Sequence, residues 1–470
     1  MDEQLDLVVI GAGPGGYVAA IRAAQLGMRA VIVERDAVGG VCLNRGCIPT
    51  KAMLRSAELL GTMQHAADYG ILADNVRLDY AAVVRRREKV VKQLTGGVGA
   101  LLQSNNVPVI KGTARLENRQ VIIDHPDGQQ QTIDARTVML ATGSVPATPP
   151  IPGADGARVI DSDGALLLDH VPASVLVIGG GAVGAEWANI FHSFGAQVTL
   201  VEMLPTLLPL EDVDMGKMLA RSFSRRGITV HTGTKLIEIG EADTGETIGL
   251  LELSDGQQTR VSAEYVMIGI GRRPNTAGLG LEAAGITTDR RGFVEVDDHL
   301  RTNVPGIVAI GDITGKQLLA HLASHQGVVA VENLAGHDKV MDYRVVPSCT
   351  FTHPEVATVG LSESAAQAAG YDVRIGTFPF QASGRAMTYG ETEGLVKVVS
   401  ESKYGELLGV HIIGASASEL IHEAALAIRL EATLDDLADT IHAHPSLAES
   451  IHEATLAACG GALHLPPRRR

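Results

Sequence analysis

Aromatic side chains are scarce in this chain, at 3% of 470 residues, and there are only four cysteines. Few aromatics leave few platforms on which single-stranded nucleic acid could stack. Positive charge is also in deficit, because the formal net charge of −15 repels phosphate backbones and anionic lipid. These absences argue against nucleic acid and against a membrane as the partner. A basic protein would suit this surface better.

Long hydrophobic runs are absent too, since no stretch approaches the ~18 uncharged apolar residues of a membrane span. The chain starts with acidic residues, whereas a secretory signal starts with basic ones. We therefore expect a cytoplasmic protein. In that reducing compartment four cysteines exclude a disulfide scaffold, and a close cysteine pair is expected to be catalytic. Hydrophobic residues at 45% and charged residues at 20% are typical of a globular protein. Its length suggests about three domains.

Glycine is plentiful, with 53 residues, and two glycine clusters stand in the same context. Residues 5–10 (LDLVVI) predict a buried strand, followed by glycines, a helix to about residue 26 and a strand over 29–34. The order recurs with a strand at 175–178, glycines, a helix to about residue 194 and a strand over 197–202. This repeat of β-α-β units predicts an α/β fold with two Rossmann-like dinucleotide-binding domains.

Each unit carries the GxGxxG pattern of a pyrophosphate site. The first glycine permits the tight turn, the second lets the backbone approach the pyrophosphate, and the third lets the helix pack close to the strand. An acidic residue 23 positions after the first glycine is expected to accept hydrogen bonds from a ribose. The predicted residues are Gly11, Gly13, Gly16 and Glu34 in the first unit, and Gly179, Gly181, Gly184 and Glu202 in the second.

The two sites are expected to bind different nucleotides. Cys42 and Cys47 closely follow Glu34, and a disulfide that exchanges electrons with a flavin must lie against its ring. The first unit is therefore expected to bind FAD and the second a nicotinamide cofactor. Glu202 favours NAD over NADP, because a carboxylate bonds free hydroxyls and repels a 2′-phosphate.

The segment Gly39–Lys51 (GGVCLNRGCIPTK) contains the two cysteines, five residues apart. On a regular helix their Cα atoms would lie roughly 8.6 Å apart, whereas a disulfide tolerates at most about 6.8 Å. The bridge can therefore close only if the helix is distorted, which Gly46 and Pro49 permit. We infer a strained, reducible bridge of the catalytic kind. Cys349 and Cys459 are isolated and are expected to be buried structural thiols.

Between and after the two units the pattern changes. A strand over 137–141 leads to the run ATGS and a proline-rich linker over 146–152, and another strand over 307–311 ends in Gly311 and Asp312. From about residue 345, strand-like segments alternate with alanine-rich helices, including 417–429 and 446–458. This texture predicts a separate C-terminal domain of α+β type.

The run GGVCLNRGCIPTK resembles the active-site signature of the flavin-linked disulfide reductases, and most closely that of the dihydrolipoyl dehydrogenases. The resemblance covers essentially the whole chain. It includes the runs ATGS at 141–144, GRRPN at 271–275, TNVPGI at 302–307, FTHPE at 351–355 and HAHPS at 442–446.

The resemblance implies four parts: an FAD-binding domain over 1–146, an NAD-binding domain over 147–270, a central domain over 271–343 and a C-terminal dimerisation domain over 344–470. It implies a homodimer in which Lys51 lies near the flavin, with Glu186 as its counter-ion. The residues that it assigns to FAD are Lys51, Gly112, Thr142, Gly143, Ser144, Asp312, Leu318, Ala320 and His321. Glu186 and Gly271 are assigned to NAD.

A base from the C-terminal domain is implied as well, delivered across the dimer interface, and it matches His444, with Glu449 as the carboxylate that orients it. An imidazole suits the task, because a thiol needs help to become a thiolate near neutral pH. Pro445 fits the first position of a helix, which would leave His444 at its exposed start. His442 is a nearby rival, but the match favours His444.

The implied reaction is oxidation of protein-bound dihydrolipoamide with reduction of NAD⁺. Lipoyl-bearing domains and the transacylase core of a 2-oxo acid dehydrogenase complex, or the glycine-cleavage system, would be the partners. Three related kinds of enzyme are the alternatives. Glutathione reductase-like enzymes usually prefer NADP, which Glu202 disfavours. Mercuric reductases add a C-terminal cysteine pair that this sequence does not have, and soluble transhydrogenases lack the first cysteine of the pair, which is present here as Cys42. A non-catalytic flavoprotein scaffold would not need all these groups. No metal site is expected, because the His422 and His452 pairs lack the second histidine of HExxH.

Overall fold

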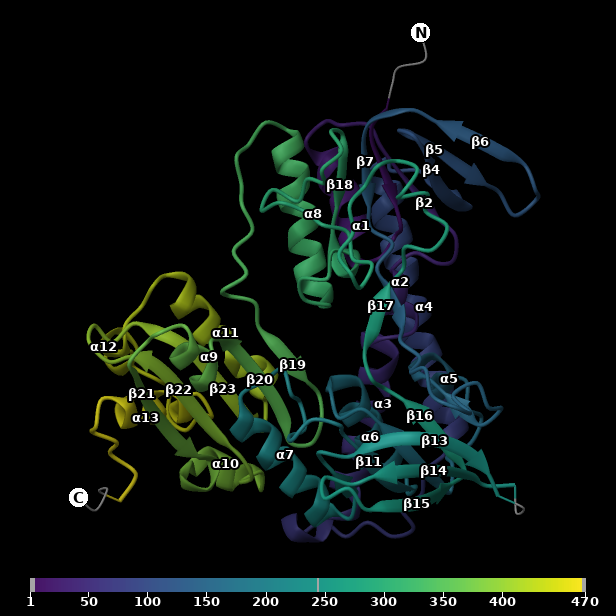
Figure 1. The fold of residues 1–470 in the computed structure, drawn as a ribbon. Coiled ribbons are helices and arrows are strands. Elements are labelled where there is room, and N and C mark those ends of the chain that lie inside the picture. The colour runs from purple at the N-terminus through teal and green to yellow at the C-terminus, as the bar shows by residue number, and fades with distance from the viewer. Residues whose placement is uncertain (1–4, 243–244, 467–470) are drawn as a thin grey trace. The chain divides into compact units, whose positions relative to one another are not determined.

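The computed structural model describes residues 5–242 and 245–466, so the expectation drawn from the acidic first residues lies outside the described part. The chain divides into two compact units (Figure 1). Unit 1 comprises Met1–Met53, Asp79–Ala147 and Gly271–Asp342, and unit 2 comprises Leu54–Leu78, Thr148–Ile270 and Tyr343–Arg470. No helix within the described ranges has the length and apolar character needed to cross a membrane.

Unit 1 is built on a five-stranded parallel sheet whose strands run β18-β7-β1-β2-β3. Its strands are β1 (Leu5–Ile10), β2 (Ala30–Glu34), β3 (Val109–Lys111), β7 (Ala135–Leu140) and β18 (Ile307–Ala309). Val8 pairs with Val31 on one side and Val138 on the other, and it is fully buried. The continuous apolar run of β1 suits this place, because parallel strands are covered on both faces.

Helices and small sheets complete unit 1. The helices are α1 (Pro14–Gln25), α2 (Gly40–Asn44), the start of α3 (Cys47–Gln64), α4 (Tyr80–Ser104), the 3-10 helix η2 (Gly311–Thr314) and α8 (Ala320–Leu334). One antiparallel sheet contains β4 (Thr113–Glu117), β5 (Gln120–Asp124) and β6 (Gln130–Ile133), and β8 (Ser144–Pro146) pairs with β17 (Arg272–Pro274).

Helices α1 and α8 lie side by side in unit 1 (Figure 1). Their backbones approach closely, because a Cβ on Gly15 would meet the Ala323 oxygen at 2.9 Å and one on Gly327 would meet the Gly15 oxygen at 2.7 Å. Glycine at both contacts therefore fixes α8 against the first glycine motif. Side chains on these two faces would force the helices apart.

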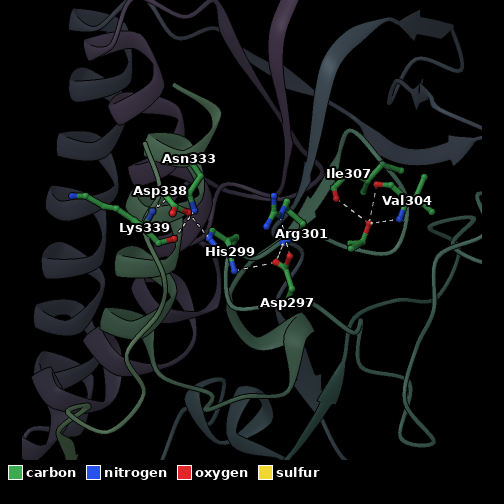
Figure 2. Close-up of polar contacts among 9 residues, drawn as sticks. Asp297, His299, Arg301, Val304, Ile307, Asn333, Asp338 and Lys339 are labelled. Atoms are coloured by element: carbon green, nitrogen blue, oxygen red, sulfur yellow. Dashed lines mark hydrogen bonds and ion pairs between the residues drawn. The ribbon is translucent and has the colours of Figure 1, made fainter. Parts of the chain in front are cut away.

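The segment after α8 is held to unit 1 by polar contacts (Figure 2). The Asn333 amide exchanges two hydrogen bonds with the Lys339 backbone, at 2.8 and 2.7 Å. His299 Nε2 lies 2.8 Å from Asp338 Oδ1, and the Asp297 carboxylate accepts the His299 backbone N–H at 3.0 Å. These contacts keep residues 335–342 with unit 1 up to the boundary.

Unit 2 contains a second parallel sheet, in the order β12-β11-β10-β16-β9. Its strands are β9 (Val159–Ile160), β10 (Ser174–Ile178), β11 (Gln197–Val201), β12 (Thr229–His231) and β16 (Tyr265–Ile268). Its helices are α5 (Ser162–Leu166), α6 (Ala182–Ser193) and α7 (Val213–Arg226), and an antiparallel sheet holds β13 (Lys235–Glu241), β14 (Thr247–Glu252) and β15 (Gln258–Ala263).

The C-terminal part of unit 2 is an antiparallel sheet with helices, as the sequence predicted. The strands are β19 (Ser348–Thr350), β20 (Glu355–Gly360), β21 (Val373–Pro379), β22 (Leu395–Glu401) and β23 (Leu407–Gly414). The helices are α9 (Glu363–Ala368), α10 (Gly384–Tyr389), α11 (Ala417–Arg429), α12 (Leu434–Ala438) and α13 (Glu449–Ala458), and the 3-10 helices of unit 2 are η1 (Ala66–Tyr69) and η3 (Phe380–Ala382). A buried apolar core unites β20–β23 with α11 and α13.

Candidate active site

The first glycine motif lies between β1 and α1, and each of its three glycines has a different steric requirement. Gly11 has φ 107°, and a Cβ there would meet the Ala141 oxygen at 2.4 Å. A Cβ on Gly16 would meet the Gly11 oxygen at 1.9 Å, so the helix can approach the turn only with glycine at this position. Nothing lies within 4 Å of a Cβ on Gly13. This open space in front of the α1 N-terminus fits a pyrophosphate.

Glu34 at the end of β2 connects the motif to its neighbouring strands. Its Oε2 accepts the Ala12 backbone N–H at 2.7 Å and its Oε1 accepts that of Asp36, also at 2.7 Å. The Glu34 backbone oxygen accepts the N–H of Gly112, which directly follows β3, at 3.1 Å. The carboxylate is therefore fixed at the edge of the sheet, where the ribose of a dinucleotide would lie.

The remaining predicted FAD residues follow the carboxyl ends of other strands of this sheet or lie in unit 1 nearby. Thr142 and Ser144 follow β7, and Asp312 follows β18. Ser144 Oγ donates to Asp312 Oδ2 at 2.5 Å. Burial raises the pKa of Asp312, although the Ser144 hydrogen bond and the nearby Arg272 charge oppose that rise. The structure thus brings the runs ATGS and GD together, as parallel-sheet topology requires.

Arg272 and Gln326 were not predicted as site residues. Arg272 Nε donates to Ser144 Oγ at 2.7 Å, so it orients the hydroxyl that bonds Asp312. Gln326 on α8 is buried, and its Oε1 accepts the Gly311 N–H at 2.6 Å. The run GRRPN was a signal for Arg272, but nothing in the sequence indicated Gln326. Leu318 precedes α8, and Ala320 and His321 begin it.

The second glycine motif repeats the geometry of the first between β10 and α6. Gly179 has φ 103°, and a Cβ there would meet the Gly269 oxygen at 2.5 Å. A Cβ on Gly184 would meet the Gly179 oxygen at 1.8 Å, whereas a Cβ on Gly181 would meet nothing within 4 Å. Unit 2 therefore offers the same kind of anion site at the α6 N-terminus.

Glu202 directly follows β11 and plays the part that Glu34 plays in unit 1. Its Oε2 accepts the Gly180 N–H at 2.6 Å and its Oε1 that of Leu204 at 2.8 Å. Glu186 on α6 is buried, and its Oε1 accepts the Phe351 N–H at 3.0 Å. Its pairing with Lys51 stays a prediction. Gly271 is the first residue of the third stretch of unit 1 and has φ 119°. Its backbone oxygen accepts the Ala147 N–H.

The cysteine pair occupies two helices rather than one. Cys42 lies in α2, which ends at Asn44, and Cys47 is the first residue of α3. The helical distortion that a bridge would need is present, because the helix is interrupted at Arg45 and Gly46, while the bridge itself stays a prediction. Pro49 falls in the first turn of α3, where a missing N–H is tolerated.

Cys42 and Cys47 are not joined by a disulfide in this structure. The hydrogen bond with Cys47 raises the pKa of Cys42 most, burial and the Cys47 charge raise it further, the Lys51 charge lowers it and Asp312 raises it. The net effect is a pKa of the Cys42 thiol above its ordinary value. The prediction that Cys459 is buried was wrong, because it follows α13 and is exposed, and Cys349 is half-buried.

In unit 2 His444 Nδ1 lies 2.8 Å from Glu449 Oε1, and Glu449 Oε2 accepts the Ser446 N–H at 2.8 Å. Burial raises the pKa of Glu449, but the Ser446 N–H and His444 outweigh it, so the pKa lies below its usual range. The His444 side chain is 79% exposed, and it is Nδ1 of the ring that contacts Glu449. An exposed imidazole held by an ionised carboxylate is arranged as a general base.

The prediction that Pro445 starts a helix was wrong. Helix α13 begins at Glu449, and residues 441–448 are irregular. The Glu449 carboxylate takes up the Ser446 N–H, which ties this segment to the first turn of the helix in place of further helical bonds. His442, the rival base, is engaged by Glu423 at 2.7 Å and is buried in its side chain, at 7% exposed.

These features define a class. Two dinucleotide sites with the same cradle fit FAD and NAD, and a close dithiol follows the first of them, so the chain is a flavin- and pyridine nucleotide-linked oxidoreductase that works on disulfides. Residues 5–327 match the family described as pyridine nucleotide-disulphide oxidoreductase, and residues 346–455 match its dimerisation domain. The chain belongs to this family, whose members bind FAD and NAD(H).

Curated relatives agree along the full length. A dihydrolipoyl dehydrogenase of Chlamydia muridarum is 43% identical and covers 100% of both chains. One of Thermus scotoductus is 45% identical over 98% of both chains. Among solved structures, LpdA from Mycobacterium tuberculosis superposes with a TM-score of 0.87 at 30% identity, over 96% of this chain and 99% of that one. The expected family is therefore confirmed.

Proposed function

We propose that this chain is a dihydrolipoyl dehydrogenase: it oxidises dihydrolipoamide to lipoamide and reduces NAD⁺ to NADH. The observation that carries the proposal is the Cys42–Cys47 pair directly after the first glycine motif, in a chain 43% identical to a dihydrolipoyl dehydrogenase along its whole length. NAD is proposed over NADP because Glu202 follows β11 with its Oε2 on the Gly180 N–H of the glycine turn, and its charge would repel a 2′-phosphate there.

The proposed acid–base chemistry follows from the site residues. In the oxidised enzyme Cys42 and Cys47 share a disulfide. His444, held by Glu449, removes a proton from one substrate thiol, and the resulting thiolate attacks the Cys42 sulfur and releases Cys47 as a thiolate. The second substrate thiol then attacks the mixed disulfide, which closes the lipoamide disulfide and expels the Cys42 thiolate, and Cys42 takes up the proton of this second thiol. The products are lipoamide, the Cys42 thiol, the Cys47 thiolate and protonated His444.

Bound FAD would supply the two-electron path from Cys47 to NAD⁺, which restores the disulfide. Gly11, Gly13, Gly16, Glu34 and Asp312 would hold FAD in unit 1. The second glycine motif with Glu202 would hold NAD in unit 2. Cys47 is the proposed electron donor and Cys42 the sulfur that exchanges with substrate, because the raised pKa of Cys42 disfavours its thiolate form.

A dimerisation domain supports a homodimer, in which His444 of one subunit would serve Cys42 of the other. Lipoyl-bearing domains are the proposed substrate form, with the transacylase core of a 2-oxo acid dehydrogenase complex as the docking partner. An acidic protein, at −15 formal charge, would suit a basic docking surface. A cytoplasmic location is part of the same proposal, because the exchange needs reducible thiols.

Steady-state assays of the purified holoenzyme test the proposal. NAD⁺ reduction by dihydrolipoamide is expected to be fast, and reduction of NADP⁺ much slower. In the reverse direction NADH should reduce lipoamide and leave glutathione disulfide untouched. A yellow protein that turns over glutathione disulfide and not lipoamide would move the substrate assignment to another disulfide while leaving the cofactors in place.

A further inference from the structure

The segment 203–212 joins Glu202 to α7 and closes over the second glycine motif. Its Leu208 donates its N–H to the Gly180 oxygen at 2.9 Å, and a Cβ on Gly180 would meet Leu207 Cδ2 at 2.6 Å. Leu207 and Leu208 are buried, and Leu208 has φ 47°. The position of this segment therefore sets the position of the Gly180 turn, whose N–H is held by Glu202.

The far end of the segment is fastened to the C-terminal sheet. The Glu211 carboxylate accepts a hydrogen bond from Ser348 on β19 at 2.7 Å and another from Thr358 on β20. Asp212, at 1% exposed, accepts the Glu363 N–H on α9 at 3.3 Å. Two consecutive carboxylates thus anchor the segment to a part of the chain that contributes no residue to either glycine motif.

Lys397 on β22 provides the positive charge at this anchor. It is 1% exposed, and its Nζ lies 3.1 Å from Asp212, 2.7 Å from Asp214 and 2.8 Å from Glu363. Burial alone would lower the pKa of Lys397, but the three carboxylates raise it above its ordinary value. His411 is also buried here, and burial lowers its pKa, so it stays neutral and Lys397 balances the carboxylates.

We propose that Lys397 is a positioning residue for the NAD site: from the C-terminal domain it holds Asp212, and through segment 203–212 it fixes the Gly180 turn and the Glu202 carboxylate. This inference rests on the NAD assignment of the proposed function. Removing a cation from water costs free energy, and this cost is offset only when oppositely charged partners are placed close to it. Two of its three contacts, Asp212 and Asp214, lie where segment 203–212 passes into α7, and the third, Glu363, lies on α9.

The test is NAD⁺ binding to the oxidised holoenzyme by calorimetry, together with KM values for NAD⁺ and dihydrolipoamide. Lys397→Met is expected to raise the Kd and KM for NAD⁺ about tenfold, because a small displacement of a binding turn is costly. The KM for dihydrolipoamide and the FAD content should not change. Lys403→Met, which removes an exposed lysine from the turn between β22 and β23, is the matched control and should change none of these values.

Loss of a buried cation can prevent folding, so a milder variant keeps the inference testable. Ser348→Ala removes one hydrogen bond to Glu211 and is expected to raise the NAD⁺ Kd about twofold to threefold. Folded Lys397→Met with an unchanged NAD⁺ Kd would overturn the inference, as would an unchanged Kd for Ser348→Ala if Lys397→Met does not fold. Wild-type protein that binds NAD⁺ but does not oxidise dihydrolipoamide would refute the proposed function and leave this inference standing.

Discussion

The two glycine motifs share their backbone angles and their main contacts. Their first glycines have φ 107° and 103°, and the glutamates that follow accept an N–H from the motif at 2.7 and 2.6 Å. Each third glycine faces the oxygen of its first glycine with no room for a side chain. The shared part is therefore the cradle for a pyrophosphate and a ribose, and by itself it does not distinguish the two cofactors.

The segments after the two glutamates differ. After Glu34 the chain passes Gly40, whose Cβ position lies 2.6 Å from Gly13 Cα, and enters the cysteine helix α2. After Glu202 it forms segment 203–212 and ends at Asp212, held by Lys397. The first motif is thus followed by the cysteine pair, and the second by a segment that is hydrogen-bonded to the C-terminal sheet. The two cradles differ in the residues that follow them.

The largest effect is expected at the segment that distinguishes the first motif. Cys42→Ser and Cys47→Ser should each lower dihydrolipoamide turnover by about 10³-fold or more, because no disulfide can form. FAD content and NAD⁺ affinity should stay at the wild-type level. Steady-state NAD⁺ reduction is the measurement, and Cys459→Ser, at an exposed thiol, is the control. Retention of a tenth of the activity in either variant would refute the redox role.

The two glutamates allow the cradles to be perturbed one at a time. In Glu34→Gln and Glu202→Gln one oxygen that accepts an N–H becomes an NH₂ donor, and a charge-assisted bond worth about 2 kcal/mol is lost. Glu34→Gln should reduce FAD retention after gel filtration roughly tenfold. Glu202→Gln should raise the KM for NAD⁺ by a similar factor and leave the flavin bound. Equal effects of both variants on both cofactors would contradict separate sites.

A smaller effect tests the open space at the middle glycines. Gly13→Ala and Gly181→Ala place a methyl group where no protein atom lies within 4 Å, so the free energy of unfolding should change by less than about 1 kcal/mol. Affinity for FAD in the first case, and for NAD⁺ in the second, should fall several-fold because the pyrophosphate approaches that face. Denaturant unfolding and cofactor titration measure the two effects. Gly61→Ala in α3, which also has open space around it, should leave both cofactor affinities unchanged and raise the free energy of unfolding by about 0.5–1 kcal/mol.

The smallest effect lies outside both motifs. Because the pKa of Glu449 is lowered in the folded protein, its contribution to stability is complete above its ordinary pKa. That contribution is lost as the pH falls through the lowered value. The unfolding midpoint of Glu449→Gln should therefore decline less than that of the wild type on acidification below about pH 5. An equal decline of the unfolding midpoint with falling pH in the two proteins would refute the lowered pKa of Glu449.

Short-range features were predictable because they depend on neighbouring residues. The apolar run of β1, the turn glycines and the charge that ends β2 all lie within 30 residues. Helix α11 spans Ala417–Arg429, as the alanine-rich pattern predicted. The start of α13 was predicted wrongly even though the contact that replaces the first helical turn is local: the Glu449 carboxylate accepts the Ser446 N–H, three residues earlier.

By itself, the sequence determined the repeat of two cradles, the broken helix between the cysteines and the family. Each of these follows from local sterics or from a short motif. The tertiary structure alone decided that Gln326 holds the Gly311 turn, that Arg272 orients Ser144, and that Lys397 meets Asp212. Lys397 and Asp212 are 185 residues apart along the chain. No local pattern specifies such a partner, because a buried charge is balanced by whatever the packing of distant strands brings within reach.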